Sequence, residues 1–194
     1  MLPTDEEEIL TFIRGLKDNS AVGIDLISGK IIKRYANLLT SSITHICNLA
    51  ISIGVFPRVF KTALIKRIYK AGEKDCVNNY RPISILPDLS KVLERLINQR
   101  LIKFLEKNTL ISPPQYDFRS GRCTNDAVHE LLNYIVVNLD GKKKCLTVFL
   151  DLAKSFDTVS ISHLLKKLER LGISGISLKL MEESILLVEH NGSE

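Results

Sequence analysis

The clearest amphipathic pattern in the chain begins at Asp88 and constrains the possible folds more than any other feature. Its apolar residues recur every three or four positions and would line one face of a helix. They are Leu89, Val92, Leu93, Leu96, Ile97, Leu101, Phe104 and Leu105. Asn108 follows as a typical terminating residue. A helix of this length must pack its apolar face against other elements, so we expect a core to form around it.

Four further segments have helical periodicity, within residues 3–17, 28–54, 124–140 and 160–172. In the first, Thr4 is predicted to cap the helix while Glu7 reaches back as a capping box. In the second, Ser28 is the predicted cap and Gly54 the stop, and Gly172 is predicted to end the last helix. The predicted apolar stripe of the second helix consists of Ile31, Ile32, Leu38, Leu39, Ile43, Ile46, Leu49, Ala50 and Ile53.

Three short segments predict extended structure. Residues 61–70 alternate in polarity and carry basic side chains, which is typical of a strand. Residues 80–87 contain two prolines and should be extended or turning. Residues 145–152 form an apolar run with the pattern of a strand. Helices outnumber these strands, so the pattern indicates mixed α/β or α+β layers.

Charge and cysteine content limit the surroundings of the protein. The net charge of +5 fits either a polyanion partner such as nucleic acid or a basic protein without one. The four cysteines lie far apart in the sequence, so we expect no disulfide and a reducing, intracellular location, nuclear or cytoplasmic. No apolar run approaches the length of about 18 residues that a membrane helix needs, so we expect no membrane partner.

Asp151 is the first candidate for chemistry, because it ends the apolar run at residues 145–152. A carboxylate in such a place is costly unless it is paired, hydrogen-bonded or bound to a metal. The alternative is that the strand ends before Asp151, which then caps the following turn. Asp157, a little further on, is explained by a turn or a helix entry.

Three arginines are candidates for anion binding. Arg81 stands in rigid extended backbone before Pro82, where a fixed guanidinium could bind a triphosphate. Arg119 and Arg122 flank Gly121 in a loop, an arrangement that can hold a phosphate backbone or a base plane.

Taken together and in order, several segments strongly resemble the reverse transcriptase of LINE-type (non-LTR), Jockey-like retrotransposons. The resemblance covers roughly residues 10–180 and rests on the segments VGIDLIS, NNYRPISILPDLSKVLERLINQRLIKFLEKNTLIS, QYDFRSGRCTNDAV, VFLDLAKSFDTV and LLKKLERLGISG. It implies an α+β fold that is rich in helices, has a small incomplete sheet and contains the fingers and part of the palm of a right-hand polymerase. The implied segments are a helical region at 1–60, fingers at 61–140 and a partial palm at 141–194.

The resemblance also implies roles for single residues. Asp151 matches a ligand of the two catalytic Mg²⁺ ions, and Phe156 matches the residue that screens the 2′ position of the incoming sugar. Arg81 matches the arginine that grips the triphosphate, with Lys91 as a weaker candidate for phosphate contact and Lys66 weaker still. The implied template-facing residues are Phe118, Arg119, Gly121 and Arg122. The implied partners are an RNA template, a DNA primer and deoxynucleoside triphosphates.

Two departures from the family pattern bear on activity. Asp117 stands where the family usually has glycine, so a positive φ there would be strained. The chain contains no Asp-Asp dipeptide, whereas the family has a second carboxylate pair in a Y/F-x-D-D hairpin. We therefore expect a fragment that is inactive by itself. The alternative is a remnant that binds nucleic acid without chemistry.

Overall fold

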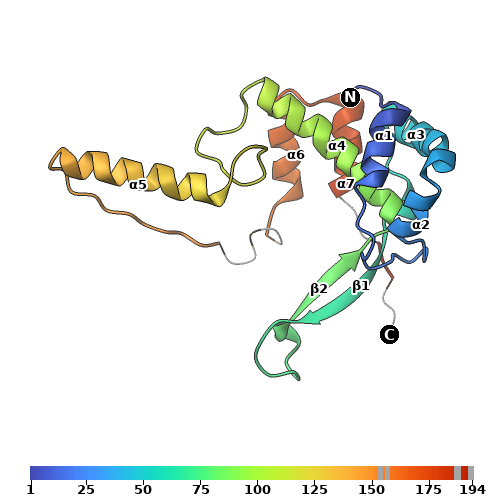
Figure 1. Cartoon of the computed structure of the whole chain (residues 1–194), viewed down its shortest axis with the longest axis horizontal. Coiled ribbons are helices and arrows are strands. Elements are labelled where there is room, and N and C mark those ends of the chain that lie inside the picture. Colours follow the sequence, from blue (N-terminus) through green and yellow to red (C-terminus); the bar gives the residue numbers. More distant parts are fainter. Residues whose placement is uncertain (153–154, 156–157, 186–188, 192–194) are drawn as a thin grey trace. The chain divides into compact units, whose positions relative to one another are not determined.

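The computed structural model comprises residues 1–194 and describes all of them except 153–154, 156–157, 186–188 and 192–194 (Figure 1). It divides into two compact units, Met1–Arg100 with Ile161–Glu194, and Leu101–Ser160. The boundary falls within the long helix α4, Asp88–Lys107, which confirms the strongest helical pattern. The division into functional segments at 1–60, 61–140 and 141–194 stays a prediction.

The first unit contains most of the helices and the described core. Besides the first part of α4, its helices are α1 (Glu6–Arg14), α2 (Gly29–Arg34), α3 (Ala36–Ile53), α6 (Ile161–Arg170) and α7 (Gly175–Ile185). Gly172 adopts φ +96° after α6, as predicted. The sequence pattern did not reveal α7, although Leu180 and Met181 of that helix are buried. No described helix combines the length and apolarity needed to cross a membrane.

The N-terminal cap of α1 lies one residue later than predicted. Asp5 accepts a hydrogen bond from the Glu8 N–H at 2.8 Å, so the prediction that Thr4 caps the helix with Glu7 is wrong. Asn48 explains the shift, because its side chain binds both the N–H and the C=O of Thr4, at 2.8 and 2.9 Å. Thr4 is thereby held outside the helix, and its hydroxyl donates to the Glu8 carboxylate at 2.6 Å.

The predicted helix at residues 28–54 is interrupted at Tyr35 and forms α2 and α3. Ser28 caps α2 and Gly54 ends α3 at φ +68°, both as predicted. The predicted apolar stripe is largely wrong, since its members Ile31, Leu38, Leu39, Ile46, Leu49 and Ile53 are exposed. The buried face of α3 is instead formed by Ala36, Thr40, Ile43, Thr44, Cys47, Ala50 and Ile51.

Helices α1 and α7 pack against α3 and account for the burial of this other face. Its side chains are smaller, so a neighbouring helix can approach closely. The two threonine hydroxyls donate to backbone carbonyls of their own helix: Thr40 to Ala36 at 2.7 Å, and Thr44 to Thr40 at 2.8 Å. Both buried hydroxyls are therefore satisfied without a partner from outside the helix.

The sheet of the first unit is built on a hairpin. β1 (Thr62–Tyr69) pairs antiparallel with β2 (Tyr80–Ile85), and the short β3 (Glu189–Asn191) pairs parallel with the start of β1. Short 3₁₀ turns, η1 (Arg58–Phe60) and η2 (Val77–Asn79), precede the two long strands. Figure 1 shows the hairpin projecting beyond the helices of its unit. The strand predicted at residues 61–70 is confirmed, and residues 80–87, predicted to be extended or turning, contain β2.

The second unit contains the end of α4, a loop, and α5 (Thr124–Asp140), which matches its predicted bounds. The prediction of a strand at residues 145–152 is wrong, because no described residue pairs with this segment. Its side chains are exposed instead, Leu150 by 88%. A strand requires a hydrogen-bonded neighbour, and apolar character alone does not provide one. Among its described residues, this unit has no buried apolar side chain.

Candidate nucleic-acid interface

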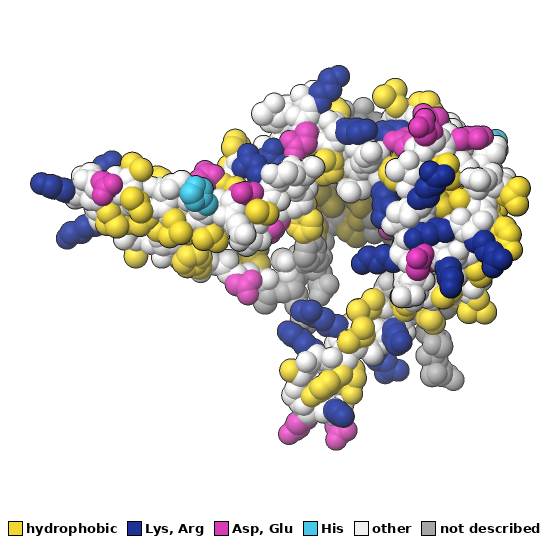
Figure 2. Space-filling view, in the orientation of Figure 1, with side chains coloured by type: hydrophobic (Ala, Val, Ile, Leu, Met, Phe, Trp, Pro, Cys, Tyr) yellow, Lys and Arg dark blue, Asp and Glu magenta, His cyan; other side chains and the backbone are white. Residues whose placement is uncertain are grey.

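The hairpin carries most of the net charge of the chain. Residues 61–85 contain six Lys or Arg and two Asp or Glu, so they contribute +4 of the total +5. Lys61 is paired with Glu183 at the base of the hairpin. The other five cations, Lys66, Arg67, Lys70, Lys74 and Arg81, pair with no carboxylate within the described part of the chain. Figure 2 shows Lys and Arg side chains along the projecting hairpin and acidic ones at its loop end.

Strand register divides these cations between two faces. Directly opposite residues share a face, and the pairs include Lys66 with Ile83, Ile68 with Arg81, Arg67 with Pro82, and Tyr69 with Tyr80. One face therefore presents Lys66 and Arg81 together with Ile68 and Ile83, and we call it the Lys66 face. The other presents Arg67, Tyr69, Tyr80 and Pro82, and we call it the Tyr69 face. The predicted triphosphate ligand Arg81 thus shares its face with Lys66.

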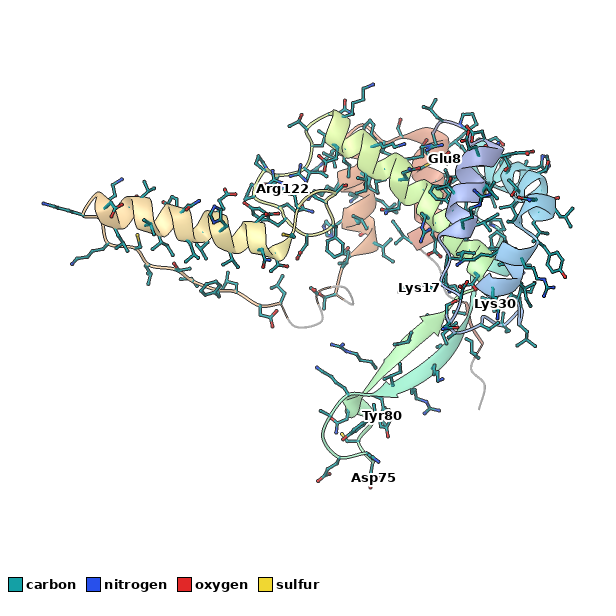
Figure 3. The ribbon with its side chains drawn as sticks, in the orientation of Figure 1. Glu8, Lys17, Lys30, Asp75, Tyr80 and Arg122 are labelled. Carbon is teal, nitrogen blue, oxygen red and sulfur yellow. The ribbon has the colours of Figure 1, made fainter. Side chains whose placement is uncertain are left out.

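The loop at the end of the hairpin is closed by hydrogen bonds. The hydroxyl of Tyr69 donates to the carbonyl of Gly72, and that of Tyr80 donates to the carbonyl of Lys74 at 2.9 Å. The side chain of Asn79 donates to the carbonyl of Glu73 at 2.8 Å. Figure 3 shows Tyr80 beside this loop, with Asp75 at its far end. These bonds fix the outer end of both strands.

Lys91 is the counter-ion of a buried carboxylate. Its ammonium lies 2.5 Å from Asp88, whose side chain is only 1% exposed and also accepts hydrogen bonds from Ser20 at 3.4 Å. A buried carboxylate is costly without such a partner, so Lys91 has a structural task at the start of α4. Its predicted contact with nucleotide phosphate stays a prediction.

Arg119 anchors the loop that follows α4. Its guanidinium donates two parallel hydrogen bonds to Glu106, at 3.0 and 2.9 Å, and a third to the carbonyl of Ser112 at 3.4 Å. Hydrogen bonding from Arg119 is the main reason why the pKa of Glu106 lies below its ordinary value. The guanidinium that was predicted to face the template therefore holds the loop onto the helix.

The other predicted template-facing residues lie in the same loop. Arg122 lies over the ring of Tyr116, with its guanidinium carbon 5.2 Å from the ring centre. Phe118 is 77% exposed, and a Cβ at Gly121 would meet nothing within 4 Å. The positive φ that the family pattern suggested for Asp117 occurs one residue later, at Phe118 with φ +62°.

Asp151 lies exposed in the unpaired segment, and Phe156 lies outside the described residues. No group of three or more His, Cys, Asp or Glu side chains that could hold a metal exists within the described ranges. The carboxylates that are described therefore do not fit a site for two Mg²⁺ ions. All four cysteines are free thiols.

Sequence reasoning missed two anchoring acids and the paired tyrosines. Asp88 and Lys91 stand three residues apart on one helix, a spacing that could have predicted their ion pair. The pairing of Glu106 with Arg119 carries no such local signal. The contact of Tyr69 with Tyr80, whose ring centres are 5.6 Å apart, follows only once the strand register is known.

Comparison with known proteins agrees with the resemblance. The sequence model of the family described as reverse transcriptase (RNA-dependent DNA polymerase) matches residues 68–193. The chain is 33% identical over 158 residues to the "Probable RNA-directed DNA polymerase from transposon X-element" of Drosophila melanogaster, covering 81% of this chain and 17% of that protein. It is 32% identical over 166 residues to the "RNA-directed DNA polymerase from mobile element jockey" of the same organism, covering 85% of this chain and 18% of that protein.

The chain thus spans less than a fifth of the length of these relatives. The family match nevertheless covers more than half of the chain and includes the loop, α5 and most of the hairpin. The chain belongs to the reverse transcriptase family and is related to the polymerases of the non-LTR retrotransposons jockey, X-element and BS.

Proposed function

We propose that the chain supplies the fingers and the first palm segment of the RNA-directed DNA polymerase of a non-LTR retrotransposon. In this proposal, the 194-residue chain alone binds RNA through the β1–β2 hairpin and does not extend a primer. The observation that carries the proposal is the concentration of charge, since the hairpin holds +4 of the chain's +5 on residues that project from their unit.

The Lys66 face is the part of the hairpin best suited to phosphate. Lys66 and Arg81 occupy diagonal positions on neighbouring strands, a spacing of roughly 7–8 Å between backbone positions. Successive phosphates of a nucleic acid or a triphosphate could contact both cations. Arg81 offers two parallel N–H groups to a phosphate, whereas Lys66 acts as a point charge. Deoxynucleoside triphosphates and an RNA template are the anions that polymerases of this family bind.

Salt-dependent RNA binding tests this proposal. Fluorescence anisotropy with a labelled single-stranded RNA should show binding that weakens as salt rises from about 50 to about 200 mM. Each phosphate contact to a single strand contributes about 0.7 to the slope of log affinity against log salt. Because Lys66→Ala/Arg81→Ala removes two such contacts, its slope should be smaller in magnitude by about 1.4.

Lys103→Ala/Lys107→Ala is the matched control. Both of these lysines are exposed on α4, and the change removes the same charge outside the hairpin. It should leave the RNA affinity and the salt slope nearly unchanged. Equal losses in the two double variants would overturn the assignment of binding to the hairpin, and absence of RNA binding at low salt would overturn the proposed function.

The expected lack of polymerase activity rests on the carboxylates. Transfer of a nucleotide requires two metal ions to be held between the attacking oxygen and the leaving pyrophosphate. Asp151 alone, in an exposed and unpaired segment, gives no such site. A primed RNA template with Mg²⁺ and deoxynucleoside triphosphates should therefore show no extension by this chain. Extension that disappears in Asp151→Ala would refute this part of the proposal.

A further inference from the structure

The Tyr69 face of the hairpin has a composition different from that of the Lys66 face. It carries one cation, Arg67, two aromatic rings, those of Tyr69 and Tyr80, and the pyrrolidine ring of Pro82. Tyr69 is 39% exposed, and Arg67 and Pro82 are also exposed. The guanidinium of Arg67 has neither a carboxylate partner nor a tyrosine ring beneath it within the described residues. This face is therefore aromatic and positively charged, and it is exposed except at Tyr80, which is half-buried.

The two tyrosine rings are held in place before any ligand arrives. Their centres are 5.6 Å apart with an angle of 59° between the ring planes. Their hydroxyls are occupied by the carbonyls of Gly72 and Lys74, so the polar ends point into the loop. Because both ends of each side chain are fixed, little conformational entropy remains to be lost when something stacks on the rings.

The chemistry of this face suits unpaired bases. Aromatic rings next to a basic strand are the usual means of binding single-stranded nucleic acid, since every base has a face that can stack. Glu73 and Asp75 in the loop are balanced by Lys70 and Lys74, so residues 70–79 have no net charge. An anionic strand is consequently attracted more to the hairpin strands, where Arg67 lies, than to the loop.

We propose that Tyr69 and Tyr80 form a stacking platform for the unpaired bases of single-stranded RNA, with Arg67 contacting its backbone. The inference rests on the proposed RNA binding and deepens it, because it assigns a second ligand contact to the opposite face of the same hairpin. The Lys66 face contacts phosphates of any strand. The Tyr69 face selects single strands over duplexes, whose bases are already stacked on each other.

Paired substitutions separate stacking from loop anchoring. Tyr69→Phe and Tyr80→Phe keep the rings and remove the hydroxyls that hold the loop. Tyr69→Leu and Tyr80→Leu keep apolar bulk and remove the rings. Affinity for a single-stranded RNA should fall by about fivefold or more in each leucine variant and stay within about twofold in each phenylalanine variant. Affinity for the same RNA in a duplex should be alike in all four variants.

Two spectroscopic readouts report stacking directly. A 2-aminopurine base in the RNA should change its fluorescence on binding the wild-type chain and both phenylalanine variants, and not on binding the leucine variants. The chain has no Trp and five Tyr, so its own tyrosine emission is also measurable. That emission should be quenched by single-stranded RNA in the wild-type chain, and less so in Tyr69→Phe/Tyr80→Phe. This second readout needs no leucine variant to be folded.

Different results bear on different proposals. RNA binding by the wild-type chain, and its loss in Lys66→Ala/Arg81→Ala, test the proposed function. Equal single-strand affinity of the leucine and phenylalanine variants would overturn the stacking platform and leave the phosphate contacts standing. Unchanged tyrosine emission on saturation with RNA would overturn it as well, and would identify the tyrosine pair as an anchor for the loop only.

Discussion

Substitution of Arg100 should destabilise the first unit, because each of the five N–H groups of its guanidinium donates a hydrogen bond. Its side chain binds both carboxylate oxygens of Glu8, at 2.7 and 2.5 Å. It also donates to the carbonyls of Leu2 and Pro3 and to the side chain of Gln99, at 3.4, 3.2 and 3.3 Å. The hydrogen bonds to Glu8 are the main reason why the pKa of Arg100 is raised. One side chain of α4 thus fixes the N-terminal segment and α1.

The expected cost of Arg100→Ala is about 2–3 kcal/mol of unfolding free energy. The side chains of Arg100 and Glu8 are only 14% and 20% exposed, so solvent screens the pair weakly. The loss stays below that of a fully buried pair, because Glu8 keeps the hydrogen bond from the Thr4 hydroxyl at 2.6 Å. The three longer hydrogen bonds add little. At about 3 °C per kcal/mol for a chain of this size, the melting temperature should fall by about 6–9 °C.

Thermal and urea unfolding followed by far-UV circular dichroism measures this change. The matched control is Arg95→Ala, on the same helix, whose side chain makes one hydrogen bond of 3.4 Å to the Phe12 carbonyl. That control should change the unfolding free energy by less than about 0.5 kcal/mol. Arg100→Lys keeps the charge without the planar fork and should fall between the two. If Arg100→Ala is as stable as Arg95→Ala, the hydrogen-bond network contributes nothing and the reasoning is refuted.

Three other measurements follow from burial and charge. Burial raises the pKa of Cys47 to about 12, so iodoacetamide near neutral pH should modify the exposed cysteines and spare Cys47 until denaturant is added, as mass spectrometry would show; early labelling of Cys47 would contradict its burial. Hydrogen exchange should be much faster in α5 than in α3, because the second unit has no buried apolar side chain among its described residues; equal protection would contradict this. Because the pKa of Glu106 is lowered by Arg119, this pair should stabilise the fold fully above about pH 4.5 and lose its effect as pH falls through the lowered pKa. The NMR signal of the Arg119 Nε–H should therefore change with pH with a midpoint below pH 4.5. A midpoint at or above pH 4.5 would refute the stabilising interaction of Arg119 with Glu106.

Helices with local end signals could be predicted from the sequence. The caps at Ser28, Gly54 and Gly172 depend on residues within one turn of the helix end, so the pattern contains what decides them. The cap of α1 is the exception. It is decided by Asn48, which binds Thr4 from a different helix and has no signal near Thr4 in the sequence.

The buried face of α3 could not be predicted from periodicity. The helix is apolar on more than one side, and the larger residues, such as Leu38 and Leu49, were the natural choice for the core. The face with Ala36, Thr40 and Ala50 is buried instead. Periodicity identifies that a helix has apolar faces, whereas the size of the space beside it decides which one is buried.

The sequence predicted which residues belong to the candidate site, but it did not predict how they are arranged. Arg81 was singled out. That Lys66 lies beside it on the same face follows only from the register of the two strands, which a ten-residue connection joins. The role of Arg119 depends on Glu106, which lies thirteen positions away in the sequence. The strand at residues 145–152 was predicted from apolar alternation, and this pattern cannot say whether a neighbouring strand is present.

The uneven distribution of charge has a consequence for how fast and in what orientation the chain meets a polyanion. With +4 on residues 61–85 and only +1 on all the others, long-range attraction acts almost entirely on the hairpin. At low ionic strength, the first unit should turn its hairpin toward an approaching phosphate chain before any contact forms. The association rate should then fall steeply with salt, while the lifetime of the complex depends on the contacts made afterwards.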